Sequence, residues 1–308
     1  MRVLILGAGA IGGYYGARLI EAGHDVTYLV RPARAALLAE RGLRVHRGEG
    51  EFARPVQAIT AIAPSASYDL VIVSCKASDL ESAITAIAPA VGAGTLVLPL
   101  LNGLRQLDAL DSTLGAARVL GGVCHISVTL DVDGSIRQFG ALDRLTFGSR
   151  DPELPIPDCV VGGLRRLGPN AIQSADILAA MWEKFAFIAA LAGITCLMRG
   201  SVGDIIATAE GADLATRLYL ECAHTARCSG YPLAAQTMAD AERFLTTHDS
   251  PLKASMLRDV ERGARTEAEH ILGDLRERAL ARGLDTPLLA AALAHLRVYE
   301  ASHVRVTS

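Results

Sequence analysis

Features that mark several classes of protein are missing from this 308-residue sequence. The six cysteines lack the spacing of a disulfide framework, which is typical of a cytosolic chain with reduced thiols; they are Cys75, Cys124, Cys159, Cys196, Cys222 and Cys228. No basic block or acidic tail occurs and the formal net charge is −3, so neither nucleic acid nor an anionic membrane is an expected partner. No internal repeat, low-complexity segment, Walker loop or G-x-S-x-G motif is present. These absences predict a cytoplasmic globular protein of one or two domains, which can bury a core without disulfides or metals.

Two stretches could be mistaken for functional segments. The apolar run from Ile177 to Met198 is long enough to span a bilayer, but it contains Glu183 and Lys184, and charges are costly at membrane depth. We therefore predict a helix buried between layers of protein. The stretch "ECAHTARCSG" holds His224 but offers no fourth zinc ligand, so we expect buried core cysteines there and assign no metal. The other histidines are scattered and suggest no role.

Short apolar runs alternate with amphipathic runs in the first half of the chain, a pattern typical of a parallel sheet with crossover helices. The predicted strands are Val3–Leu6, Val26–Val30, Leu70–Ser74, Leu96–Leu100 and Val119–Gly122. Two antiparallel strands around a turn at Asp133 and Gly134 should follow, and "PNAIQSAD" is a candidate for one more short strand. Helical periodicity then continues from about Ile177 to about Ala301. We predict an α/β fold with a doubly wound Rossmann-type domain at 1–175 and an all-helical domain at 176–308.

The first predicted strand leads into a glycine-rich loop. Gly7, Gly9 and Gly12 have the G-x-G-x-x-G spacing and are followed by a helical pattern, which is the context of a dinucleotide-binding loop. Gly7 permits the tight turn, Gly9 lets a pyrophosphate approach the backbone, and Gly12 lets helix and strand pack closely. The N–H groups at the helix start attract the phosphates. The alternative is a structural glycine turn in another doubly wound protein.

The second predicted strand, "DVTYLVR", ends in Arg31, where an NAD-binding protein usually has an acidic residue for the ribose 2′-hydroxyl. Arg34 follows one helical turn later. A guanidinium favours a 2′-phosphate through charge-assisted hydrogen bonds, so NADPH is the expected cofactor. The alternative is a solvated arginine at the end of a strand.

With these residues in view, the chain resembles the ketopantoate reductase (2-dehydropantoate 2-reductase) family over nearly its whole length. The resemblance is carried by the glycine loop with Arg31, "VSCKASDL" with Lys76, "LLNGL" with Asn102, "WEKF" with Lys184, and "SMLRDVERGARTE" with Ser255 and Glu267. It implies a Rossmann-type domain and a helical domain with substrate in the cleft between them, and an NADPH hydride delivered to the ketone of a 2-oxo acid.

The resemblance also implies roles for single residues. Lys184 matches the proton donor, and Asn102 matches an asparagine that touches both nicotinamide ribose and substrate. Ser255 matches a serine that holds the substrate. The cofactor residues implied are Gly7, Ala8, Gly9, Ala10, Ile11, Gly12, Arg31, Lys76, Asn102, Ile126 and Glu267.

The residues themselves agree with this chemistry. Hydride addition leaves negative charge on the ketone oxygen, which the ammonium of Lys184 can stabilise and protonate. The alternative is a lysine that reaches water and pairs with an acid elsewhere. Lys76 and Asn102 each follow a predicted strand, at the edge where open α/β sheets bind ligands; a solvated lysine and an Asn-Gly turn are the alternatives.

Glu267 and Ser255 fall on one predicted helix, Glu267 on the flank of its apolar face. Twelve residues separate them, or about 18 Å along a straight helix. They therefore cannot hold one group of atoms, and the helix would have to border the cleft lengthwise. The alternatives are a rim charge at Glu267 and an ordinary helix-start residue at Ser255.

Three positions depart from the family pattern. Asparagines usually follow the lysine at positions occupied here by Ile188, Ala192 and Val202. Loss of such partners should weaken binding of a hydroxylated substrate by about 1 kcal/mol or more per hydrogen bond. Ile188 and Ala192, as substrate-side residues, would suit a more apolar 2-oxo acid. We predict NADPH-dependent reduction of ketopantoate to pantoate in pantothenate biosynthesis. The alternatives are reduction of a more apolar 2-oxo acid and NADP(H) sensing without turnover, and a homodimer stays open.

Overall fold

The computed structural model describes residues 1–48, 50–64 and 66–307, and the chain divides into two compact units. The first comprises Met1–Leu101 and Gln106–Ala180, and the second comprises Asn102–Arg105 and Met181–Ser308. The segment Asn102–Arg105 thus groups by its contacts with the helical unit, although the chain on both sides of it belongs to the first. The predicted boundary between residues 175 and 176 stays a prediction.

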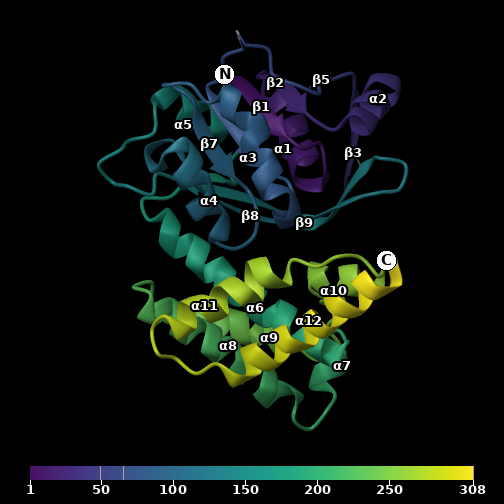
Figure 1. Cartoon of the computed structure of the whole chain (residues 1–308), viewed down its shortest axis with the longest axis vertical. Coiled ribbons are helices and arrows are strands. Elements are labelled where there is room, and N and C mark those ends of the chain that lie inside the picture. The colour runs from purple at the N-terminus through teal and green to yellow at the C-terminus, as the bar shows by residue number, and fades with distance from the viewer. Residues whose placement is uncertain (49, 65, 308) are drawn as a thin grey trace. The chain divides into compact units, whose positions relative to one another are not determined.

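The first unit contains a five-stranded parallel sheet with the strand order β5-β2-β1-β6-β7 (Figure 1). Its strands are β1 (Arg2–Leu6), β2 (Asp25–Leu29), β5 (Gln57–Ile59), β6 (Leu70–Val73) and β7 (Leu96–Pro99), and the helices among them are α1 (Ala10–Glu21), α2 (Pro32–Arg41), α3 (Leu80–Ile87) and α4 (Arg105–Leu114). β6 is buried along its whole length, as expected for a parallel strand covered on both faces. The chain leaves β1 towards β2 on one side and later adds β6 on the other. The carboxyl end of β1 is therefore the topological switch point, where such sheets bind ligands.

A second five-stranded sheet lies in the same unit. Its strands are β3 (Leu43–Arg47), β4 (Gly50–Arg54), β8 (Gly121–Leu130), β9 (Ile136–Gly148) and β10 (Ala171–Gln173), and α5 (Asp158–Arg165) precedes β10. The order is β10-β9-β3-β4, with β8 paired antiparallel to β9. The predicted hairpin around Asp133 and Gly134 is present as β8 and β9, and the candidate strand in "PNAIQSAD" is present as β10.

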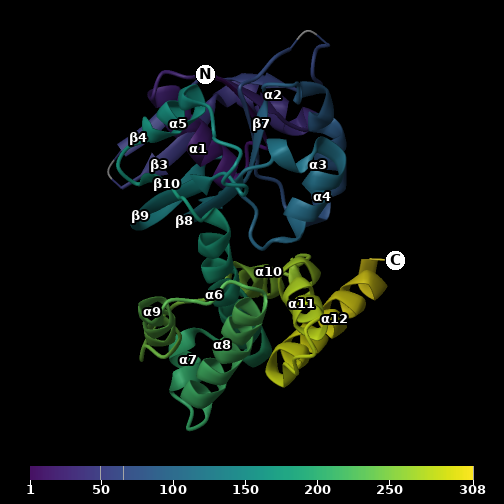
Figure 2. The same ribbon diagram turned by 90° about the vertical axis from the view of Figure 1, so that its left-hand side faces the viewer.

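Helix α1 lies between the two sheets (Figure 2). Its sequence allows this because glycines face both neighbours. A Cβ on Gly12 would overlap the hydroxyl of Ser74, the residue that follows β6. A Cβ on Gly13 would overlap the side chain of Ile136 on β9. The start of α1, and with it the glycine loop, is therefore fixed on two sides.

The second unit is built from helices, with no strand among the residues described. They are α6 (Ile177–Met198), α7 (Val202–Ile206), α8 (Gly211–Cys228), α9 (Ala235–Leu245), α10 (Ser255–Glu261), α11 (Asp274–Leu280) and α12 (Pro287–Thr307). α6 is long and apolar enough to cross a membrane, but 61% of its most apolar window is buried inside the protein. It is the core helix of this unit, as predicted.

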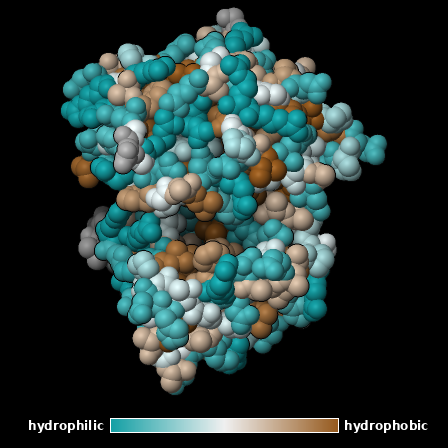
Figure 3. Space-filling view, turned by 180° about the vertical axis from the view of Figure 1, so that it is seen from behind, coloured by the Kyte–Doolittle hydropathy of each residue, from teal (hydrophilic) through white to brown (hydrophobic). Residues whose placement is uncertain are grey.

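The face of the protein shown in Figure 3 is largely hydrophilic, with apolar patches scattered among hydrophilic residues.

Two predictions about elements need correction. Val119–Gly122 was predicted as a fifth parallel strand, but Val119 makes only a single parallel bridge to Val97, and from Gly121 the chain belongs to β8 of the other sheet.

The continuous helix predicted through Ser255 and Glu267 is wrong. α10 ends at Glu261 and is followed by Gly263 with a φ of 68°, a conformation that only glycine adopts at low cost. The 18 Å estimate along a straight helix therefore does not apply.

Candidate functional site

The glycine loop has the geometry of an anion-binding turn. The chain leaves β1 at Leu6, turns at Gly7 with a φ of 91°, and enters α1 at Ala10. Gly9 is the N-cap of α1, and nothing lies within 4 Å of the point that a Cβ would occupy. The first turn of α1 carries no acidic residue. Open space beside backbone N–H groups at a helix N-terminus suits a phosphate.

Two side chains hold this loop in place from outside. The Ser74 hydroxyl donates to the Leu6 carbonyl over 3.0 Å. Arg34 donates from Nε to the Ala8 carbonyl over 3.0 Å and from Nη1 to the Gly134 carbonyl over 2.9 Å. Burial lowers the pKa of the Arg34 guanidinium. Arg34 therefore ties the glycine loop to the β8–β9 turn, which sequence reasoning did not foresee.

The predicted basic residues lie at the same edge of the first sheet. Arg31 follows β2 and its side chain is 77% exposed, while Lys76 follows β6 and is exposed as the N-cap of a short 3-10 helix, η1 (Ala77–Asp79). The last residue of that turn, Asp79, forms an ion pair with Arg31 over 2.8 Å. Ile126, also predicted on the cofactor side, is half-buried on β8 in the second sheet, next to a register shift.

In the second unit, Asn102 and Gly103 pack against a π-helical segment, η4 (Glu269–Gly273). His270 on this segment is 8% exposed and hydrogen-bonded to the backbone of Asn102. Gly103 has a φ of 87°, and the point that its Cβ would occupy is 3.3 Å from the His270 carbonyl oxygen. Burial lowers the pKa of His270, and the negative charge of the nearby Glu267 opposes this effect. His270, to which sequence reasoning gave no role, is therefore hydrogen-bonded to the backbone of Asn102 and feels the charge of Glu267.

Charged side chains anchor the same segment to its neighbours. Arg105 pairs with Glu277 and, over 3.8 Å, with Asp274, and Asp274 also accepts from Arg278 Nε over 3.0 Å. Burial raises the pKa of Asp274, and Arg278 opposes the shift. The guanidinium of Arg278 lies 5.7 Å from the ring centre of Trp182 on α6. The Asn102–Arg105 loop and the segment that carries His270 are therefore held by one network.

Lys184 is half-buried on α6, beside the fully packed Trp182 and Phe185. One helical turn later Ile188 is also half-buried, but Ala192 is 3% exposed and Val202 is 1% exposed. Lys184 and Ile188 therefore form a partly accessible stripe, while the other two positions belong to the packed interior. Ser255 is exposed at the first position of α10.

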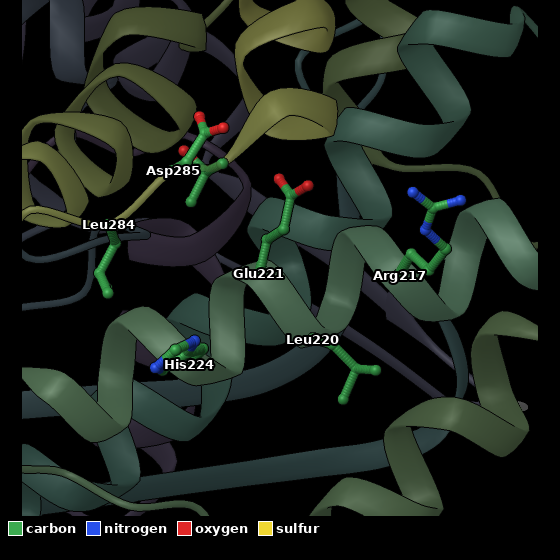
Figure 4. A pocket seen from close by; sticks show the side chains of 7 residues that line it. Arg217, Leu220, Glu221, His224, Leu284 and Asp285 are labelled. Atoms are coloured by element: carbon green, nitrogen blue, oxygen red, sulfur yellow. The ribbon is translucent and has the colours of Figure 1, made fainter.

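A pocket of about 260 Å3 lies elsewhere in the helical unit (Figure 4). Glu221 in its wall accepts hydrogen bonds from the backbone N–H groups of Leu288, over 3.0 Å, and Leu289, over 2.9 Å. This carboxylate therefore has a structural role, because it caps the start of α12. The lining is Arg217, Leu220, Glu221, His224, Leu284, Asp285 and Thr286, and none of these is a predicted site residue.

The fold and these residues define a class of protein, the two-unit nicotinamide-dependent oxidoreductases. Family models agree with this class. The model described as ketopantoate reductase PanE/ApbA matches residues 3–152, and the model of its C-terminal part matches residues 176–300. The chain belongs to the ketopantoate reductase (PanE/ApbA) family, as the sequence motifs predicted. It is an NAD(P)H-dependent oxidoreductase that acts on 2-oxo acids.

Individual relatives extend over almost the whole chain. The uncharacterized oxidoreductase YkpB of Bacillus subtilis is 35% identical over 98% of this chain and 99% of its own length. The crystal structure of 2-dehydropantoate 2-reductase from Geobacter metallireducens has a TM-score of 0.86 at 29% identity, over 96% of this chain and 99% of that one. D-mandelate dehydrogenase, solved with NADH and anilino(oxo)acetate, has a TM-score of 0.86 at 21% identity over 98% and 99% of the two chains, which shows a shared fold. The predicted fold class is confirmed, whereas the predictions of NADPH and of individual site residues stay predictions.

Proposed function

We propose that this protein transfers a hydride from NADPH to the ketone of a 2-oxo acid, with 2-dehydropantoate as the substrate and pantoate as the product, in pantothenate biosynthesis. The observation that carries the cofactor choice is an exposed guanidinium, Arg31, at the edge where the glycine loop begins. Arg31 would bind the 2′-phosphate, with Lys76 as a second cation. The proposed location is the cytoplasm, where the scattered cysteines would stay reduced.

In the proposed reaction, Lys184 is the residue that protonates the ketone oxygen. The reduced nicotinamide supplies the hydride when bound, and the electron pair of the C=O bond moves to oxygen. Lys184 donates its proton to that oxygen and regains one from solvent. Asn102 orients ribose and substrate, Glu267 lies on the cofactor side, and Ser255 binds the substrate.

A second candidate substrate has its own support. Ile188, one turn from Lys184, is half-buried and offers methyl groups at a position where the family pattern described above has an asparagine. Such a surface favours a 2-oxo acid with a branched or aromatic side chain, because apolar area is removed from water. Anilino(oxo)acetate, bound to the similarly folded D-mandelate dehydrogenase, is an aromatic acid of this kind. A third candidate is an NADP(H)-binding sensor without turnover.

One assay separates the three. Oxidation of NADPH is followed by its absorbance with 2-dehydropantoate, a branched aliphatic 2-oxo acid and phenylglyoxylate. The proposal predicts the highest kcat/KM with 2-dehydropantoate. A higher value with either apolar acid supports the second candidate, and tight NADPH binding without oxidation by any acid supports the third. Size-exclusion chromatography with light scattering tests for a homodimer.

A further inference from the structure

The ion pair between Arg31 and Asp79 crosses the mouth of the glycine loop. Arg31 follows β2 and Asp79 lies in the turn after β6, and these strands are the two neighbours of β1. Strands two positions apart in a sheet are separated by about 10 Å. The two side chains nevertheless meet at 2.8 Å, so the segments that follow β2 and β6 approach each other beyond the carboxyl end of β1.

This pair costs little to open. The side chains are 77% and 40% exposed, and ion pairs of this kind contribute about 0–1 kcal/mol to stability. Asp79 therefore has little value as a structural residue. Its charge matters more to a ligand, because an incoming 2′-phosphate needs the same guanidinium N–H groups and carries a charge of about −1.5 to −2.

We propose that Asp79 is a specificity-determining residue, an internal competitor that holds Arg31 and weakens the preference for NADPH over NADH. This inference rests on the proposed use of Arg31 for the 2′-phosphate. NADPH must break the pair or share Arg31 with a carboxylate of like charge, whereas NADH has no phosphate at this position and does neither. The carboxylate thus penalises one cofactor and not the other.

The test compares two acidic residues, of which Asp79 contacts Arg31 and Glu81 does not. Asp79→Asn removes the charge that faces Arg31. Glu81→Gln removes an equal charge from the exposed first turn of α3, where the carboxylate makes no ion pair within the described residues. Dissociation constants for NADPH and NADH are measured by isothermal titration calorimetry on the full-length protein, at low and at high salt. Asp79→Ser is prepared as well, in case the Asn variant folds poorly.

We expect Asp79→Asn to tighten NADPH binding about threefold to fivefold at low ionic strength, and less in high salt, because screening weakens the repulsion. NADH binding should change by less than about twofold, and Glu81→Gln should behave like the wild type. Unchanged NADPH affinity in both Asp79 variants overturns the inference while leaving the reductase proposal intact. Weaker NADH binding in Asp79→Asn also overturns it, because Asp79 would then be a ribose ligand. Failure of the wild type to bind either nucleotide overturns both proposals.

Discussion

At the scale of single residues, Lys184 can be judged against the other lysines. The chain has only three, namely Lys76, Lys184 and Lys253. Lys253 forms an ion pair with Glu261 over 2.7 Å on the surface of the helical unit. Lys184 is half-buried as well, but it lies on an apolar helix beside Trp182. Ordering a long cationic side chain there has an entropic cost, which favours a functional reason for its presence.

The first prediction concerns this lysine. Lys184→Ala should lower kcat by at least about a hundredfold, because the developing alkoxide loses its proton donor. NADPH affinity should be nearly unchanged, since Arg31 and the glycine loop remain. Steady-state kinetics and nucleotide titration check both parts. Lys253→Ala is the matched control and should keep full activity; a Lys184 variant with near-normal kcat would remove Lys184 from the mechanism.

The second prediction separates two positions that look alike in sequence. Ile188→Asn places an amide on the partly accessible stripe beside Lys184, and should raise kcat/KM for 2-dehydropantoate relative to phenylglyoxylate. Ala192→Asn places the same amide where the side chain is 3% exposed, and should lower the free energy of unfolding by about 1–3 kcal/mol without this gain. Urea unfolding and the paired kinetics distinguish them. If the substrate ratio is unchanged in Ile188→Asn, Ile188 does not contact the substrate.

At the scale of elements, the glycine loop shows why similar glycines differ in function. The third prediction compares Gly12→Ala with Gly9→Ala. A methyl on Gly12 overlaps the Gly7 carbonyl and Ser74, so overpacking should cost about 1–3 kcal/mol of stability. A methyl on Gly9 meets no protein atom within 4 Å at a φ of −79°, so stability should stay within about 0.5 kcal/mol.

NADPH affinity, in contrast to stability, should be affected by the substitution at Gly9. The Gly9 methyl enters the space proposed for the pyrophosphate, and should weaken NADPH binding by about tenfold or more in a protein of normal stability. Thermal unfolding and nucleotide titration of the same samples provide the comparison. Unaltered NADPH affinity in Gly9→Ala would show that the phosphates do not approach this residue.

The sequence allowed prediction of elements whose signals are local. The core strands β1, β6 and β7 are mainly apolar runs, β2 is rich in β-branched and aromatic residues, and the turn after β1 needs glycine at fixed offsets. Each of these elements could therefore be found without knowledge of its neighbours. The strands β3 and β4 of the second sheet could not, because "LRVHR" and "GEFAR" are short and charged, and the edge strand β4 exposes most of its residues. Asp79 and His270 were missed for a related reason. Their partners, Arg31 and Asn102, are distant in sequence, and only the folded chain brings them together.

At the scale of the whole molecule, the described residues of each unit include one buried histidine whose pKa is lowered by burial. His24 in the first unit lies 3.0 Å from the Gly163 carbonyl, and His270 in the second unit is hydrogen-bonded to the backbone of Asn102. A base with a lowered pKa binds fewer protons in the folded than in the unfolded state. Stability from these groups is therefore complete above the unfolded pKa of about 6.5, and is lost as the pH falls towards the folded value.

The fourth prediction follows from this loss of stability at lower pH. The free energy of unfolding should fall between pH 7.5 and 5.5, by at most about 1.4 kcal/mol per pH unit for each histidine. Gln at position 24 or 270 should reduce the fall, and if the units unfold in separate transitions, His24→Gln should affect one and His270→Gln the other. Asp274, beside His270, has a raised pKa and acts in the opposite direction, so each variant is compared with the wild type by urea unfolding at both pH values. If His270→Gln keeps the full pH dependence of its transition, protonation of His270 does not limit the acid stability of the helical unit, and other groups of that unit must account for it.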